Sequence, residues 1–122
     1  MVLGNFSVGL SVKNFAKSRE FYEKLGFCVI RGDNTRWAIM QNASATIGIY
    51  EGVIEKNILT FTQGWDGNGQ DVDPFEDLRS VQRELKSRGI EFEIQAPMDS
   101  QGPTCATFRD PDGNLIVLDQ HR

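Results

Sequence analysis

The segment FRDPDGNLIVL, Phe108 to Leu118, decides how the last part of this chain folds. Asp110 at the first turn position, Pro111 after it and Gly113 in the left-handed position predict a type I turn closed by a bulge. An EF-hand calcium loop needs its glycine at the sixth position, whereas Gly113 is only the fourth residue from Asp110. The segment therefore predicts a β-hairpin with a three-residue loop and no calcium.

The part of the chain before this hairpin predicts a strand, a loop and a helix. The strand is ILTFT, 58–62, and the polar loop GWDGNGQDVD, 64–73, follows it. Asp73 is the expected N-cap of the helix, with Pro74 at the first helical position and Glu76 completing a capping box. Apolar residues at helical spacing continue to a glycine, and the strands EFEI, CATF and LIVL complete the order strand, helix, three strands.

The first half of the chain has the same order of predicted elements. Alternating apolar residues predict a strand over 6–12, and Asn14 caps a helix that ends at Gly26. FCVIRG predicts the next strand, and two further strands, 37–40 and 46–50, flank the polar loop QNASA. A half of this size has little core of its own, so we expect two packed modules, about 1–56 and 57–122, in a single domain spanning 1–122.

A duplicated unit of this kind, with SREFYEKLGF in its first half and FRDPDGNLIVL in its last, resembles the vicinal oxygen chelate superfamily. That group holds glyoxalase I, extradiol dioxygenases, fosfomycin-resistance enzymes and bleomycin-resistance proteins. The resemblance covers essentially the whole chain. It implies an α+β fold in which two tandem βαβββ modules form a cup-shaped mixed eight-stranded sheet, with the helices outside and the ligand site within.

The resemblance also identifies four cup-facing positions from which the metal enzymes of the family take their ligands. Here these positions hold Ser7, Gly48, Ile58 and Val117, and Val117 stands where the family has a glutamate after the turn phrase. A catalytic zinc or iron needs three or four imidazole, thiolate or carboxylate ligands, and this chain has one histidine. We therefore expect no metal and no other cofactor.

The remaining reactive side chains have ordinary structural interpretations. Glu51 and Glu55 lie just beyond Gly48 and are expected in a solvated acidic loop rather than as substitute ligands. Cys28 and Cys105 lack metal-ligand spacing and are expected to be reduced and buried. His121 is the penultimate residue, where we expect fraying.

Strand alternation predicts which residues line the inside of the cup. Apolar residues of one parity are expected under the helices, namely Ile47, Ile49, Leu59, Phe61, Phe108, Ile116 and Leu118. The hairpin register pairs Thr107 with Val117 and Arg109 with Leu115, which adds Thr107 and Arg109 to the inner face. The predicted ligand-binding residues are Ser7, Tyr50, Ile58, Thr60, Thr62, Trp65, Thr107, Arg109 and Val117.

The sequence contains two tryptophans, Trp37 and Trp65, whose positions we assign separately. Trp65 lies in a loop with three glycines beside the strand 58–62, and we expect it to close over the cup as a lid. A rival interpretation packs Trp65 permanently in a subunit interface or against the second helix. Trp37 is expected in the core, because aromatic side chains are mostly buried.

Composition excludes several classes of partner. Thirteen basic and seventeen acidic residues give a net charge of −4 with no Lys/Arg cluster, which argues against nucleic acid. No apolar run approaches the roughly 20 residues of a membrane span, and the N-terminus lacks the basic start of a signal peptide. We expect a cytoplasmic protein, and the family resemblance implies a homodimer.

Two classes of function remain open. The first is a metal-free protein of the sequestration or resistance type that binds a small organic molecule, planar or cationic because the chain is net negative. The second is a lyase, isomerase or dioxygenase-type enzyme with a non-standard active site, using Tyr50 or Asp119 as acid or base. Binding is favoured, since the sequence contains no evident pair of nucleophile and base.

Overall fold

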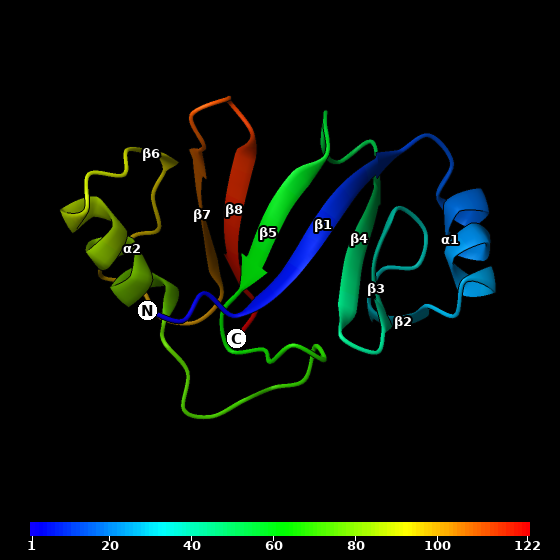
Figure 1. The fold of residues 1–122 in the computed structure, drawn as a ribbon, viewed down its shortest axis with the longest axis horizontal. Helices are drawn as coiled ribbons and strands as arrows, with labels where there is room; N and C mark the ends of the chain where they lie inside the picture. Colours follow the sequence, from blue (N-terminus) through cyan, green and yellow to red (C-terminus); the bar gives the residue numbers. More distant parts are fainter.

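The computed structural model describes all residues, 1–122, as one curved sheet with a helix at each end (Figure 1). The elements in chain order are β1 (Asn5–Val12), α1 (Phe15–Lys24), β2 (Cys28–Gly32), β3 (Trp37–Asn42), β4 (Ala45–Glu51), β5 (Ile58–Thr62), α2 (Leu78–Ser87), β6 (Phe92–Ile94), β7 (Thr104–Arg109) and β8 (Leu115–Gln120). Both modules thus have the predicted order of strand, helix and three strands. Neither helix is long and apolar enough to cross a membrane.

The eight strands form a mixed sheet in the order β2-β3-β4-β1-β5-β8-β7-β6. Within each module the first strand pairs in parallel with the last, β1 with β4 and β5 with β8. The two modules meet where β1 pairs antiparallel with β5, from Asn5 opposite Thr62 to Gly9 opposite Ile58. The predicted α+β fold and the single mixed sheet are therefore confirmed.

Helix α1 begins and ends where the sequence predicts. The Asn14 side chain accepts a hydrogen bond from the Lys17 backbone N–H at 3.0 Å, and Gly26 adopts a φ of +93° after the last turn. Glu51 also contributes, because its carboxylate accepts a hydrogen bond from the Phe15 backbone N–H at 2.7 Å. That contact ties the end of β4 to the start of the helix.

Helix α2 begins four residues later than predicted, and Asp77 rather than Asp73 caps it. Gln120 at the end of β8 fixes this start: its Oε1 accepts the Leu78 N–H at 2.7 Å, and its Nε2 donates to Asp77 at 3.0 Å. Asp73 forms an ion pair with Arg122 instead. The capping-box prediction was wrong because a residue distant in sequence selects the cap.

Two apolar clusters fill the spaces between the sheet and the helices. One joins α1 to the sheet through Phe15, Ala38, Met40 and Ile49. The other joins α2 to the sheet through Leu78, Val81, Leu85, Ala96, Ala106, Phe108 and Leu118. Ile47, Phe61 and Ile116 pack against these clusters, as strand parity predicts.

Three smaller expectations are wrong. Trp37 lies on the inner face, where its ring stacks on Tyr50 at 6.3 Å between centroids. Cys28 and Cys105 are exposed, and Cys28 lies on the edge strand β2. The polar loop predicted over 41–45 is largely strand, because β3 and β4 extend to Asn42 and Ala45.

The turn after β7 has the predicted form. Gly113 donates its N–H to the Asp110 carbonyl at 3.0 Å and has a φ of +87°. Hydrogen bonds from the side chain and backbone of Asn114 hold the pKa of the Asp110 carboxyl below its usual value. The resulting register pairs Thr107 with Val117 and Arg109 with Leu115, which confirms the predicted hairpin.

Both ends of the chain lie beside the exit of β5. The carbonyl of Leu3 accepts a hydrogen bond from Gln63 Nε2 at 2.7 Å, and the Arg122 guanidinium donates to the Gly64 carbonyl at 3.0 Å. Figure 1 shows the two termini at the same end of the sheet.

Candidate functional site

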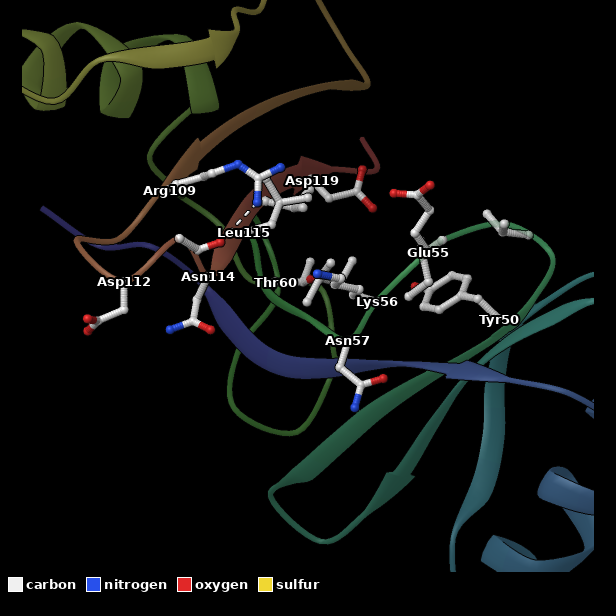
Figure 2. Close-up of a pocket in the computed structure, with 15 residues that line it drawn as sticks. Tyr50, Glu55, Lys56, Asn57, Thr60, Arg109, Asp112, Asn114, Leu115 and Asp119 are labelled. Atoms are coloured by element: carbon white, nitrogen blue, oxygen red, sulfur yellow. Dashed lines mark hydrogen bonds between the residues drawn. The ribbon is translucent and has the colours of Figure 1, made fainter.

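The inner face of the sheet holds a cavity of about 610 Å³ at the end opposite the termini. Its walls come from β4, β5 and β8, from the end of β7, from the segment 53–57 that joins the modules, and from the turn that follows β7 (Figure 2). Both modules therefore contribute side chains to one cavity.

Five of the nine predicted ligand-binding residues line this cavity, namely Tyr50, Ile58, Thr60, Arg109 and Val117. Ser7, Thr62 and Thr107 are on the same face of the sheet but are buried outside the cavity wall. Strand parity could assign a face to each of them. It could not tell which part of that face a loop would cover.

Trp65 does not line the cavity, so the expected lid position is wrong. Trp65 is 3% exposed, and its ring stacks on the His121 ring with 4.9 Å between centroids. The guanidinium of Arg31, a residue of β2, lies 5.1 Å from the centroid of the Trp65 ring. His121 is correspondingly held in place, with 16% of its side chain exposed, rather than frayed. The arrangement resembles the rival interpretation in which Trp65 is packed permanently, although the partners are Arg31 and His121.

The loop that carries Trp65 covers the end of the inner face near the termini. Asn5 donates to the Asp66 carbonyl at 2.9 Å, and Gln41 donates to the Gly67 carbonyl at 3.3 Å. These bonds join the loop to β1 and β3 in the first module. The loop therefore closes one end of the cup, and the cavity occupies the other.

Several cavity residues were not predicted as ligand-binding residues. They lie on the segment between the modules and in the hairpin turn, and include Glu55, Lys56, Asn57, Asp112 and Asn114. Glu55 was expected in a solvated loop; it is exposed, yet its side chain borders the cavity (Figure 2). Neither segment has a periodic pattern, so only the folded sheet shows that both reach the same rim.

Tyr50 lies flat against the middle of the inner face. A Cβ atom at Gly48 would be 2.6 Å from Tyr50 Cε2, and one at Gly9 would be 3.3 Å from the same atom, so two glycines make room for the ring. Burial, with a smaller contribution from the negative charge of Asp119, raises the pKa of Tyr50 to about 12. The hydroxyl is therefore a neutral hydrogen-bond donor at physiological pH.

Asp119 and Arg109 are the charged groups that β7 and β8 bring to the wall. Asp119 Oδ2 lies 3.1 Å from His121 Nε2, which connects the cavity to the Trp65 stack. The Arg109 guanidinium is engaged by Glu93 at 2.6 Å and by the Gly113 carbonyl at 2.9 Å. Asp119 has no basic ion-pair partner other than His121, which is charged only when protonated.

The four positions that resemble metal-ligand positions lie close together on the inner face. Gly9 pairs with both Gly48 and Ile58, while Thr60 pairs with both Ser7 and Val117. None of the four side chains at these positions is a strong metal ligand. No group of three His, Cys, Asp or Glu residues in the structure has the geometry of a metal site. The residues present do not fit a catalytic metal.

The fold and the cavity define a protein in which paired βαβββ modules form one cup. A sequence model of the Glyoxalase/Bleomycin resistance protein/Dioxygenase superfamily matches residues 6–118, and the chain belongs to this superfamily. A comparison with curated protein sequences gives no match.

Two solved structures share this fold at low sequence identity. One is a Legionella pneumophila protein described as an NAD-dependent benzaldehyde dehydrogenase, with 18% identity, a TM-score of 0.68 and coverage of 96% of this chain and 99% of that chain. The other is a superfamily member from Vibrio splendidus 12B01, with 14% identity, a TM-score of 0.56 and coverage of 95% and 97%. At these identities the similarity shows the fold alone.

Proposed function

We propose that this protein binds a small organic molecule in the cavity of the cup without using a metal. The observation that carries the proposal is the 610 Å³ cavity on the inner face, because its volume falls in the range of roughly 300–1,000 Å³ typical of small-molecule sites. The poor fit of Ser7, Gly48, Ile58 and Val117 to a metal supports the second part of the proposal.

The lining favours a planar molecule that carries a polar or cationic group. Ile58, Leu115 and Val117 offer apolar surface, and the Tyr50 ring offers a flat aromatic one. The carboxylates of Glu55 and Asp119 both border the cavity (Figure 2). A cation held there would gain electrostatic attraction in addition to apolar burial.

The binding proposal is tested with a variant that fills the cavity. Val117→Trp places a large ring among Tyr50, Ile58 and Thr60, whereas Val29→Trp makes the same change on the edge strand β2, away from the cavity. A library of planar amines and neutral aromatic compounds is screened by ligand-detected NMR. We expect binders that lose affinity with Val117→Trp and keep it with Val29→Trp. Equal affinity for both variants would place the binding site elsewhere.

The metal part of the proposal has its own measurement. Elemental analysis of the purified, dialysed protein is expected to find no stoichiometric zinc, nickel, iron or manganese. One equivalent of such a metal, lost on substitution of residues at the four inner-face positions, would contradict the proposal.

A further inference from the structure

Asp119 and Tyr50 bring two complementary proton-transfer groups to one cavity. Asp119 comes from β8 in the second module and Tyr50 from β4 in the first. Both line the cavity, and Figure 2 labels both side chains at its wall. Ile58 and Val117 line the same wall and give a bound molecule apolar contacts.

The Asp119 carboxylate is held by a contact that leaves one oxygen free. Oδ2 lies 3.1 Å from His121 Nε2, and His121 is fixed by its stack on the buried Trp65. When His121 Nε2 carries the proton, it donates to Oδ2 and orients the carboxylate. Oδ1 has no hydrogen-bond partner within the protein and is available to a bound molecule.

The Tyr50 hydroxyl is available as a donor. Burial and the charge of Asp119 account for the raised pKa of Tyr50, and no hydrogen bond to the hydroxyl contributes. The ring is held over Gly48 and Gly9 and against Trp37, so the donor is positioned before a ligand arrives. A preorganised neutral donor stabilises a developing oxyanion most effectively where water is partly excluded.

We propose that this cavity catalyses cofactor-independent proton transfer on ketones that carry an aromatic ring on the carbon beside the carbonyl, with Asp119 as the base and Tyr50 as the donor to the carbonyl oxygen. The proposal rests on the binding function proposed above. Asp119 removes a proton from the carbon beside the carbonyl; the C–H electron pair forms the C=C bond of the enolate, and the carbonyl π pair moves to oxygen. The proton on the Asp119 carboxyl group exchanges with solvent, and the carboxyl group then delivers a solvent-derived proton to carbon, which in D₂O is a deuteron. The cycle neither consumes nor requires an oxidant, a reductant or a metal.

The chemistry of the cavity selects this class of substrate. The flat Tyr50 ring suits an aromatic ring of the ligand, and the ketone oxygen accepts the Tyr50 hydrogen bond. A carboxylate is a weak base, and it abstracts a carbon-bound proton effectively only where a donor stabilises the enolate oxygen. A ring conjugated with the enolate lowers the cost of that step further.

The test follows hydrogen–deuterium exchange of phenylacetone in D₂O by ¹H NMR, with binding measured in the same samples by saturation transfer. We expect the unmodified protein to accelerate loss of the benzylic CH₂ signal over buffer. Asp119→Asn and Tyr50→Phe should each lower the rate by ~100-fold. Asp99→Asn, which removes an exposed carboxylate outside the cavity, should not change the rate.

Two further variants separate catalysis from folding. If Asp119→Asn fails to fold, Asp119→Ala with added acetate replaces it, and acetate should restore part of the exchange. His121→Phe keeps a ring beside Trp65 but removes the contact with Asp119. As a positioning residue, His121 should affect kcat while leaving KM unchanged.

Each outcome decides the inference. Binding of phenylacetone without exchange, or exchange that survives in both Asp119→Asn and Tyr50→Phe, overturns it and leaves the binding function intact. Absence of both binding and exchange overturns it for ketones with an aromatic ring on the α-carbon, the class it names. The ligand screen with Val117→Trp decides the binding function separately.

Discussion

At the scale of single residues, the position of Tyr50 depends on the absence of a side chain at residue 48. A Cβ atom there would lie 2.6 Å from Tyr50 Cε2 and 2.8 Å from its hydroxyl oxygen, closer than real contacts allow. The Tyr50 ring thus fills the space beside one of the four inner-face positions discussed above. A glycine and a tyrosine two residues apart shape the floor of the cavity.

Gly48→Ala is therefore expected to displace the Tyr50 ring without unfolding the protein. The backbone at residue 48 has no left-handed φ, and the closest atoms belong to the movable end of a side chain. We expect ligand affinity and proton exchange to fall about tenfold, roughly 1.4 kcal/mol, with a small change in Tm. Gly67→Ala is the matched control, since a Cβ there meets nothing within 4 Å. Equal binding by the two variants would contradict this account of Tyr50.

At the scale of elements, the start of α2 offers two candidate caps. Local sequence favours Asp73, whereas the tertiary contact with Gln120 favours Asp77. Asp77→Ala removes the cap and its bond to Gln120 and should lower the free energy of unfolding by about 1 kcal/mol. Asp73→Ala removes only an ion pair in which Asp73 is 70% exposed, and should cost less. Urea titrations of the two variants give the comparison. A larger loss of unfolding free energy in Asp73→Ala than in Asp77→Ala would support the capping box predicted from sequence.

The same helix cap predicts a pH dependence. Burial opposes ionisation of Asp77, but hydrogen bonds from Gln120 and Arg79 outweigh it and lower the pKa. A lowered folded-state pKa contributes stability that is complete above the unfolded value of about 3.9 and is lost as pH falls through the folded value. Asp77→Asn should therefore show a weaker loss of stability in this acid range than the unmodified protein. Parallel acid-denaturation curves would contradict the assignment.

The loop that carries Trp65 is expected to stabilise the fold rather than gate the cavity. Trp65→Ala leaves a space between Arg31 and His121 and should lower the free energy of unfolding by about 3 kcal/mol or more. Ligand affinity should change little, because Trp65 is outside the cavity wall. Thermal melts and ligand titrations of the same variant provide the check. A large loss of affinity with an unchanged Tm would support the lid expected from sequence.

The elements differ in how far sequence could predict them. The DPDGN turn sets its own geometry through Asp110 and Gly113, so the hairpin register followed from local chemistry. The start of α2 did not follow from local chemistry, because the cap Asp77 is selected by Gln120, which is 43 residues away in the sequence. Trp65 and His121 likewise come into contact only in the folded chain. The predicted lid position of Trp65 and the predicted fraying at His121 were wrong for this reason.

At the scale of the whole molecule, both the sheet and the cavity depend on contacts between modules. The pairing of β1 with β5 joins the halves, and each half supplies part of the cavity wall. Strand parity predicted the inner face correctly because each strand alternates by itself. The extent of the cavity depended on where 53–57 and the β7–β8 turn lie, and no local pattern specifies that.

Homodimer formation stays a prediction at this scale, based on the family resemblance and on how common two-fold pairing is among soluble proteins. Sedimentation velocity at micromolar concentration should show a dimer. A monomer throughout that range would contradict it.

The nearness of the two chain ends has a consequence for connectivity. Leu3 and Arg122 bond to the neighbouring residues Gln63 and Gly64, so a short linker could join the termini without disturbing either module. A circular permutant opened within 53–57 would keep all eight strands in the same sheet, with the modules in the reverse sequence order. Because that segment forms one cavity wall, the new ends would lie at the binding rim. We therefore expect such a permutant to keep the fold. Its ligand site should change more, because the segment 53–57 that links the modules forms part of the cavity wall.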